Sequence, residues 1–305
     1  MEGPVKNLSH PISAGKTIFL LVITVVLSSL VGLLILLGVA YFKGIGIADL
    51  GSQLSLNSNA GERNFSRLLV FQNHLFTFIL PTLVASWMIF RGDWWHKLGF
   101  NSFKRILNPL LGASFLVLAI PMTGVLYWIN QKVPLPDFML DLESSTNEMI
   151  QAILIADSNF EMLFNVFIIG MLPAFGEEII FRGYLQRQLS RLFQNHHIGI
   201  LFAAFLFSAI HMQFQGFLPR FFLGGLLGYL FYWTGNIWVP IIAHFAHNTF
   251  QVVAVYFSEE KIQEMDLSAV EITPFPQLAI FTSLAILIGF YTYQVNKGNR
   301  LRLLR

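Results

Sequence analysis

Two adjacent carboxylates stand inside an apolar stretch at residues 175–183, which read FGEEIIFRG. On a helix, Glu178 and Arg182 are four residues apart and share one face, so the two side chains can neutralise each other. Glu177 lies about 140° further around the helix from Arg182, so this segment offers it no partner. One acid would suffice for a structural ion pair that locks two helices, which is the plainer interpretation. The second acid therefore predicts a functional carboxylate at Glu177.

Imidazole groups that could meet such a carboxylate occur in two later apolar stretches. FSAIH places His211 at the end of one stretch, and AHFAHN places His244, His247 and Asn248 within another. His244 and Asn248 are four residues apart and share a helical face, and His247 could join them. The other five histidines, which we interpret as surface or packing residues, are His10, His74, His96, His196 and His197.

These residue types are suited to hydrolysis. A carboxylate and an imidazole acting on one water supply a general base and a group that positions the water. A second imidazole and a carboxamide on one helical face supply two donors for a developing oxyanion. The sequence has neither a GxSxG serine motif nor an HExxH zinc helix. A zinc site formed by Glu177, His211 and His244 stays open, because imidazole and carboxylate are acceptable zinc ligands.

Membrane helices must position these residues. The chain has 305 residues, of which 55% are hydrophobic and 12% charged, against roughly 25% charged in an ordinary soluble domain. Apolar runs of about 20 residues, long enough to cross a bilayer, recur along its length. We predict eight spans, near Thr17–Tyr41, Leu68–Phe90, Ile106–Trp128, Phe160–Phe181, Ile198–His211, Phe217–Trp233, Ile237–Phe257 and Phe275–Tyr293.

The expected fold is therefore all-α, a polytopic membrane protein with about eight transmembrane helices. We expect one integral membrane domain over residues 1–305, with a motif-bearing core at about 160–257. If 160–194 forms one helix that turns into the next, Glu177 and His211 lie roughly 27 and 21 Å from the turn. His244 and Asn248 lie roughly 12 and 18 Å along a third helix. These depths predict that the helices enclose one intramembrane polar chamber.

Charge placement predicts the orientation. With a cytoplasmic N-terminus, the inside segments hold 13 of the 19 basic residues, and 13 of the 17 acidic residues fall in external loops or, as Glu161 does, at the first turn of the adjoining span. Those inside segments are 1–16, 91–105, 182–197, 234–236 and 294–305. Basic residues accumulate on the cytoplasmic side of membrane proteins, so both termini are expected to face the cytoplasm. We expect an integral, multi-pass protein of a prokaryotic plasma membrane.

Three motifs carry a resemblance to a known family. They are EExxxR at Glu177–Arg182, FxxxH at Phe207–His211 and HxxxN at His244–Asn248, in this order on separate predicted helices. The set resembles the motifs of the CPBP intramembrane endopeptidase family, also called ABI. This family includes the CAAX prenyl proteases and bacteriocin-processing or immunity proteins. Each motif alone is weak, but the ordered set is specific.

The resemblance implies an eight-helix fold with a catalytic chamber inside the membrane. It implies that Glu177 and His211 activate water and that His244 and Asn248 donate to the oxyanion. Glu178 and Arg182 match the supporting positions of the first motif. His247 lies outside the motifs and has no assigned role.

We therefore expect a CAAX-protease-like intramembrane endopeptidase that needs no cofactor. Its expected partners are the lipid bilayer and a peptide or protein substrate, with lipidated or membrane-associated substrates included. A nucleic acid is not expected, because the net charge of +2 is too small to indicate a polyanionic partner. One alternative is an immunity or scaffold protein that binds a peptide without cutting it. A proton-coupled transporter has less support, since no inverted repeat is visible.

Overall fold

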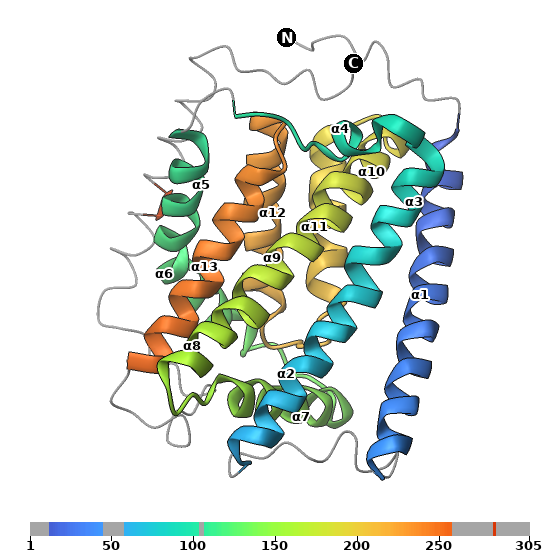
Figure 1. The fold of residues 1–305 in the computed structure, drawn as a ribbon. Coiled ribbons are helices and arrows are strands. Elements are labelled where there is room, and N and C mark those ends of the chain that lie inside the picture. Colours follow the sequence, from blue (N-terminus) through green and yellow to red (C-terminus); the bar gives the residue numbers. More distant parts are fainter. Residues whose placement is uncertain (1–11, 45–57, 104–106, 258–282, 285–305) are drawn as a thin grey trace.

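The computed structural model is helical and contains no strand in the residues it describes, which are 12–44, 58–103, 107–257 and 283–284. Its α-helices form one bundle (Figure 1). Their bounds are α1 (Ala14–Lys43), α2 (Ala60–His74), α3 (Leu80–Phe90), α4 (Trp94–Leu98), α5 (Leu107–Leu118), α6 (Ile120–Asn130), α7 (Asp137–Leu154), α8 (Asn159–Asn165), α9 (Leu172–Glu178), α10 (Gln186–Leu192), α11 (His196–Ala209), α12 (Phe217–Thr234) and α13 (Trp238–Phe257). Three π-helical turns, η2 (Leu75–Ile79), η4 (Val166–Met171) and η5 (Ile179–Leu185), and the 3₁₀ turn η3 (Arg91–Asp93) join some of them.

The protein is an integral membrane protein. Within the described ranges, four helical segments are long and apolar enough to cross a bilayer, namely Ala14–Lys43, Ala60–Leu98, Leu107–Asn130 and Asn159–Leu192. They coincide with the first four predicted spans. The next three predicted spans coincide with α11, α12 and α13, so their helical assignment is right. The eighth, Phe275–Tyr293, lies outside the described residues except for 283–284, and the total of eight spans stays a prediction.

The segment that carries the first motif is one continuous helical rod, Asn159–Leu192. Pro173 lies inside this rod, although proline lacks an N–H and its ring clashes with a preceding carbonyl in a regular helix. The rod avoids a break because the wider π turn η4 ends just before Pro173. The same arrangement recurs in a second helical rod, Ala60–Leu98, where the π turn η2 ends just before Pro81. Both rods therefore continue through their prolines.

The loops predicted to face the cytoplasm meet at one end of the bundle, at the top of Figure 1. The backbone N–H of Ile237 donates to the carbonyl of Gly99 at 2.9 Å. Arg187 donates to the carbonyl of Lys97. The described part of the first segment, residues 91–103, thus lies together with 182–197 and 234–236, as the charge bias requires. Which side of the membrane they face stays a prediction.

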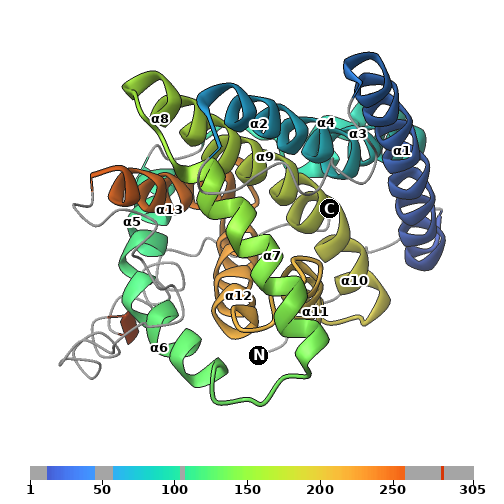
Figure 2. The ribbon, with the colours of Figure 1, turned by 90° about the horizontal axis from the view of Figure 1, so that it is seen from below.

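The opposite end is closed by α7, an 18-residue helix. Figure 2, which views this end, shows α7 lying across the bundle. Glu143 of α7 accepts a hydrogen bond from the backbone N–H of Gln215 at 2.9 Å, and Asn147 accepts one from the Gln213 amide at 2.8 Å. Helix α7 therefore also holds the segment that follows α11.

A buried polar lock joins the two rods near the same end. Arg67 of α2 is fully buried and donates to Asn165 at 2.7 Å and to Glu161 at 2.9 Å. Arg63 also donates to Glu161, at 3.1 Å, and pairs with Asp157. Buried charges are stable only when they are paired and hydrogen-bonded. The lock therefore fixes the register between Ala60–Leu98 and Asn159–Leu192.

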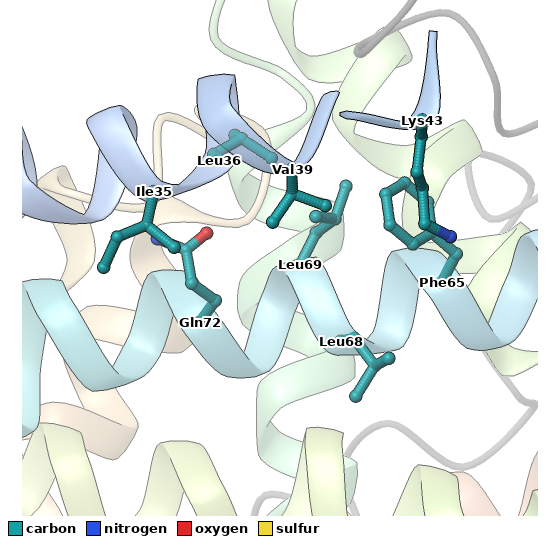
Figure 3. A pocket seen from close by; sticks show the side chains of 8 residues that line it. All are labelled: Ile35, Leu36, Val39, Lys43, Phe65, Leu68, Leu69 and Gln72. Atoms are coloured by element: carbon teal, nitrogen blue, oxygen red, sulfur yellow. The ribbon is translucent and has the colours of Figure 1, made fainter. Parts of the chain in front are cut away.

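A groove of about 260 Å³ lies between α1 and α2 (Figure 3). It is lined by Ile35, Leu36, Val39, Lys43, Phe65, Leu68, Leu69 and Gln72. The lining is apolar apart from Gln72 and Lys43, whose ammonium lies 4.4 Å from the centre of the Phe65 ring. It contains no residue of the three motifs, so this groove is not the predicted polar chamber.

Cysteine labelling tests the predicted orientation, since the chain has no native cysteine. Asp93, just before α4, and Asp137, the first residue of α7, are exposed. These two helices lie at opposite ends of the bundle (Figure 1). In intact cells, a membrane-impermeant maleimide should label Asp137→Cys, whereas Asp93→Cys should react only after permeabilisation. The reverse pattern would invert the orientation, and labelling of both in intact cells would contradict the alternating topology.

Candidate active site

The ion pair predicted from the first motif is present and fully buried. Nη1 of Arg182 donates to Oε1 of Glu178 at 2.7 Å, and the side chains are 1% and 0% exposed. Nη2 of Arg182 donates to the carbonyl of Gly224 in α12 at 3.1 Å. The guanidinium also lies 4.6 Å from the centre of the Phe207 ring in α11. The pair thus ties the rod Asn159–Leu192, called the central rod below, to α11 and α12.

His244 of α13 binds the same carboxylate oxygen. Its Nδ1 lies 3.0 Å from Oε1 of Glu178. An ionised carboxylate only accepts hydrogen bonds, so Nδ1 of His244 is the donor. Spacing along α13 placed His244 among the chamber residues, and the structure shows that its direct partner is Glu178 rather than Glu177. Glu178 therefore supports Arg182 and His244 together.

Asn248 lies one turn further along α13 and faces the rod at η4. Its Nδ2 donates to the carbonyl of Ile169 at 3.1 Å. A carboxamide carries two N–H hydrogens, so this bond leaves one donor for another partner. Ile169 is eight residues before Glu177 in the sequence. The structure thus brings Asn248 to the same rod as Glu177. The hydrogen bonds of the described residues include none between these two side chains.

Glu177 is buried, with 5% of its surface exposed, and two imidazoles approach it. Nε2 of His211 lies 3.9 Å from Oε1 of Glu177, so the predicted Glu177–His211 pair is brought together. Nε2 of His74 lies closer to the same oxygen, at 3.6 Å. The interpretation of His74 as a surface or packing residue missed this contact. An ionisable residue inside a membrane span was the signal that could have found it.

His211 lies just beyond the end of α11, in a short loop. Its Nδ1 donates to the carbonyl of Phe207 at 2.7 Å, which fixes the ring. The next residue, Met212, has φ = 53°, a left-handed conformation that is unfavourable for a side chain of this kind. Arg220 of α12 donates to Gln213 at 2.7 Å, which helps to hold the loop in that conformation. Backbone strain of this kind is often found at functional sites.

His247 belongs to a different contact. It is buried against α5, with Nδ1 3.4 Å from the carbonyl of Leu116. Its Nε2 lies 2.9 Å from the Gln251 side chain. No hydrogen bond or ion pair links it to Glu177 or Glu178, so the structure separates His247 from the three motifs. Its placement makes it a useful control for the residues beside it.

The residues of the zinc alternative do not form a ready metal site. Among the described residues, no group of three histidine, aspartate or glutamate side chains is placed to hold a metal ion. His244 is bonded to Glu178, whereas His211 faces Glu177. The structure thus places His244 on a different carboxylate from His211.

Comparison with known proteins agrees with the motifs. Residues 159–250 match the family model of type II CAAX prenyl endopeptidase Rce1-like proteins. This segment holds all three motifs, and the match supports its assignment to the CPBP family. The resemblance seen in the sequence is thereby confirmed for this part of the chain.

One curated relative and the solved structures complete the comparison. A stretch of 85 residues, 27% of the chain, is 35% identical to the Uncharacterized protein YpbD of Bacillus subtilis (strain 168). The matched stretch spans 40% of that relative's length. No solved structure matches the chain.

The two adjacent acids should respond differently to neutralisation. Glu178→Gln leaves Arg182 buried without its counter-charge, which should lower the free energy of unfolding by about 3–5 kcal/mol. Glu177 is not paired with a buried guanidinium. The Glu177→Gln variant should therefore stay folded. Thermal unfolding of both variants in one detergent measures the difference. A larger loss in Glu177→Gln would reverse these roles.

Proposed function

We propose that this protein is a CAAX-protease-like intramembrane endopeptidase that hydrolyses a peptide bond with a Glu/His-activated water. The observation that carries the proposal is the buried Glu177 carboxylate facing an imidazole nitrogen of His211 at 3.9 Å. A second buried acid, Glu178, already satisfies Arg182. The match of this segment to Rce1-like prenyl endopeptidases supports the same reaction class.

Water activation follows from the hydrogen-bond roles. Because Nδ1 of His211 donates to a carbonyl, Nε2 of the neutral ring is an acceptor. A water that donates one hydrogen to Nε2 and the other to Glu177 presents its lone pair to a substrate carbonyl. Glu177 takes a proton as the water oxygen bonds to the carbonyl carbon. It then gives this proton to the leaving amine as the C–N bond breaks.

His244 and Asn248 are the proposed donors to the oxyanion. Nδ1–H of His244 is held by Glu178, so its Nε2 can donate only when the ring is an imidazolium. Asn248 would contribute the amide hydrogen that is not bonded to Ile169. Donors in such positions stabilise the tetrahedral intermediate more than the substrate.

The oxyanion role separates an enzyme from a protein that only binds peptides. Asn248→Ala should lower the single-turnover cleavage rate by about 10²–10³-fold, with little change in peptide affinity. His247→Ala is the matched control, because it lies on the same helix but faces α5, and its effect should be much smaller. A peptide library first identifies a cleaved sequence, with Glu177→Gln as the inactive reference.

Two outcomes would count against the proposal. Equal losses of affinity and rate in Asn248→Ala would remove its oxyanion role. A library that binds the protein and is not cleaved under any condition tested would favour the immunity or scaffold alternative.

A metal ion should not be required for cleavage. Dialysis of the active protein against a strong chelator should leave the single-turnover rate unchanged, because Glu177 and His211 themselves activate the water. Stoichiometric zinc that is lost together with activity, and whose return restores activity, would show that the zinc alternative is right. Inhibition by added zinc would not support the zinc alternative, because Glu177 and His211 could capture the added ion.

A further inference from the structure

A second imidazole reaches the carboxylate oxygen that His211 faces. Nε2 of His74 is 3.6 Å from Oε1 of Glu177, compared with 3.9 Å for Nε2 of His211. The His74 side chain is also the less exposed of the two, at 15% against 26%. His74 ends α2 and lies outside both the three motifs and the segment that matches the family.

The hydrogen-bond roles around His74 imply a shared proton. Its Nδ1 lies 3.1 Å from the carbonyl of Val70, which can only accept, so Nδ1 carries a hydrogen. In a neutral ring, Nε2 would then present a lone pair to the Glu177 carboxylate, and the two acceptors would repel each other. At 3.6 Å, a hydrogen on Nε2 would attract the carboxylate, whereas a lone pair would repel it. When Glu177 is ionised, that proton makes His74 an imidazolium.

The other charged and titratable groups near Glu177 have different partners. Besides His74 and His211, His244 from α13, Arg182 from η5 and Arg220 from α12 lie close enough to interact electrostatically with Glu177. Arg182 and His244 donate to Glu178, and Arg220 donates to Gln213. His211 can stay neutral if a water donates to its Nε2. His74 is therefore the group placed to balance the charge of Glu177.

The fold holds His74 firmly against the central rod. Arg67 lies seven residues before His74, which is about two helical turns and the same face of α2. It is anchored to Glu161 and Asn165 on the rod that carries Glu177. The buried lock thus joins the helix that ends at His74 to the rod that carries Glu177.

We propose that His74 is a positioning residue for Glu177. Its ring, fixed on the carbonyl of Val70, keeps the Glu177 carboxylate ionised and directed toward the water at His211. The proton on Nε2 of His74 stays there during the reaction, and the proton taken from water passes through Glu177 to the amine. This inference rests on the proposed function for its catalytic consequence, but the charge balance between His74 and Glu177 can be measured without it.

The experiment compares His74→Phe and His74→Gln with Asn73→Ala. Asn73 adjoins His74, and its side chain contacts the hydroxyl of Thr77 rather than Glu177. Two assays are run on each variant. The first measures kcat and KM for cleavage. The second measures labelling by dicyclohexylcarbodiimide, which reacts with protonated carboxyl groups in apolar surroundings. Mass spectrometry of peptide fragments then locates the label on Glu177.

His74→Phe should lower kcat by about 10–100-fold, the loss typical of a misplaced reacting group, with KM nearly unchanged. Labelling of Glu177 should rise several-fold, because the carboxyl group loses its cation and becomes protonated. His74→Gln, which keeps an N–H donor without a charge, should have an intermediate kcat and raised labelling. Asn73→Ala should match the unmodified chain in both quantities, whereas a purely structural role for His74 would leave labelling unchanged.

Unchanged kcat and unchanged labelling in a folded His74→Phe protein would overturn the proposal. If His74→Phe does not fold, His74→Gln provides the test. The proposal then fails if labelling of Glu177 in His74→Gln equals that in the unmodified chain. Should the unmodified chain cleave no peptide, the proposed function fails. Labelling would then still show whether His74 holds Glu177 ionised.

Discussion

Burial of charge inside a membrane protein is the constraint on which the site depends. An ion that leaves water loses solvation worth several kcal/mol, so it must meet a counter-charge and further hydrogen bonds. Oε1 of Glu178 meets this requirement by accepting from both Arg182 and His244. Arg182 donates onward to a carbonyl of α12. One carboxylate therefore fixes the positions of the central rod, α12 and α13, and leaves Glu177 available for chemistry.

Helical rods interrupted by π turns allow this arrangement within apolar sequence. A π turn widens the helix locally, and such turns recur at functional sites in proteins. Here η4 and η5 flank α9, the short helix that carries both acids. The carbonyl of Ile169 in η4 accepts from Asn248, and Arg182 lies within η5. Irregular backbone thus lies on both sides of the acids, where neighbouring helices supply the partners it needs.

Two sets of contacts outside the motifs complete the support of the site. The lock of Arg63, Arg67 and Glu161 joins the rod that carries His74 to the rod that carries Glu177. The second set joins α7 to the loop after His211, through Glu143 and Asn147. Both sets lie at the same end of the bundle (Figure 2). The positions of both imidazoles beside Glu177 therefore depend on helices that carry no motif.

The sequence by itself determined the features that depend on spacing within one helix. Span length and composition identified an all-helical membrane protein, and the four-residue spacing of Glu178 and Arg182 identified their ion pair. Similar depths also predicted that His211 would reach Glu177. Only the tertiary structure decided which acid His244 binds, that His74 also reaches Glu177, and that His247 faces α5 instead. Those contacts depend on the rotation and depth of one helix against another, which long-range packing sets and which spacing along a single helix does not encode.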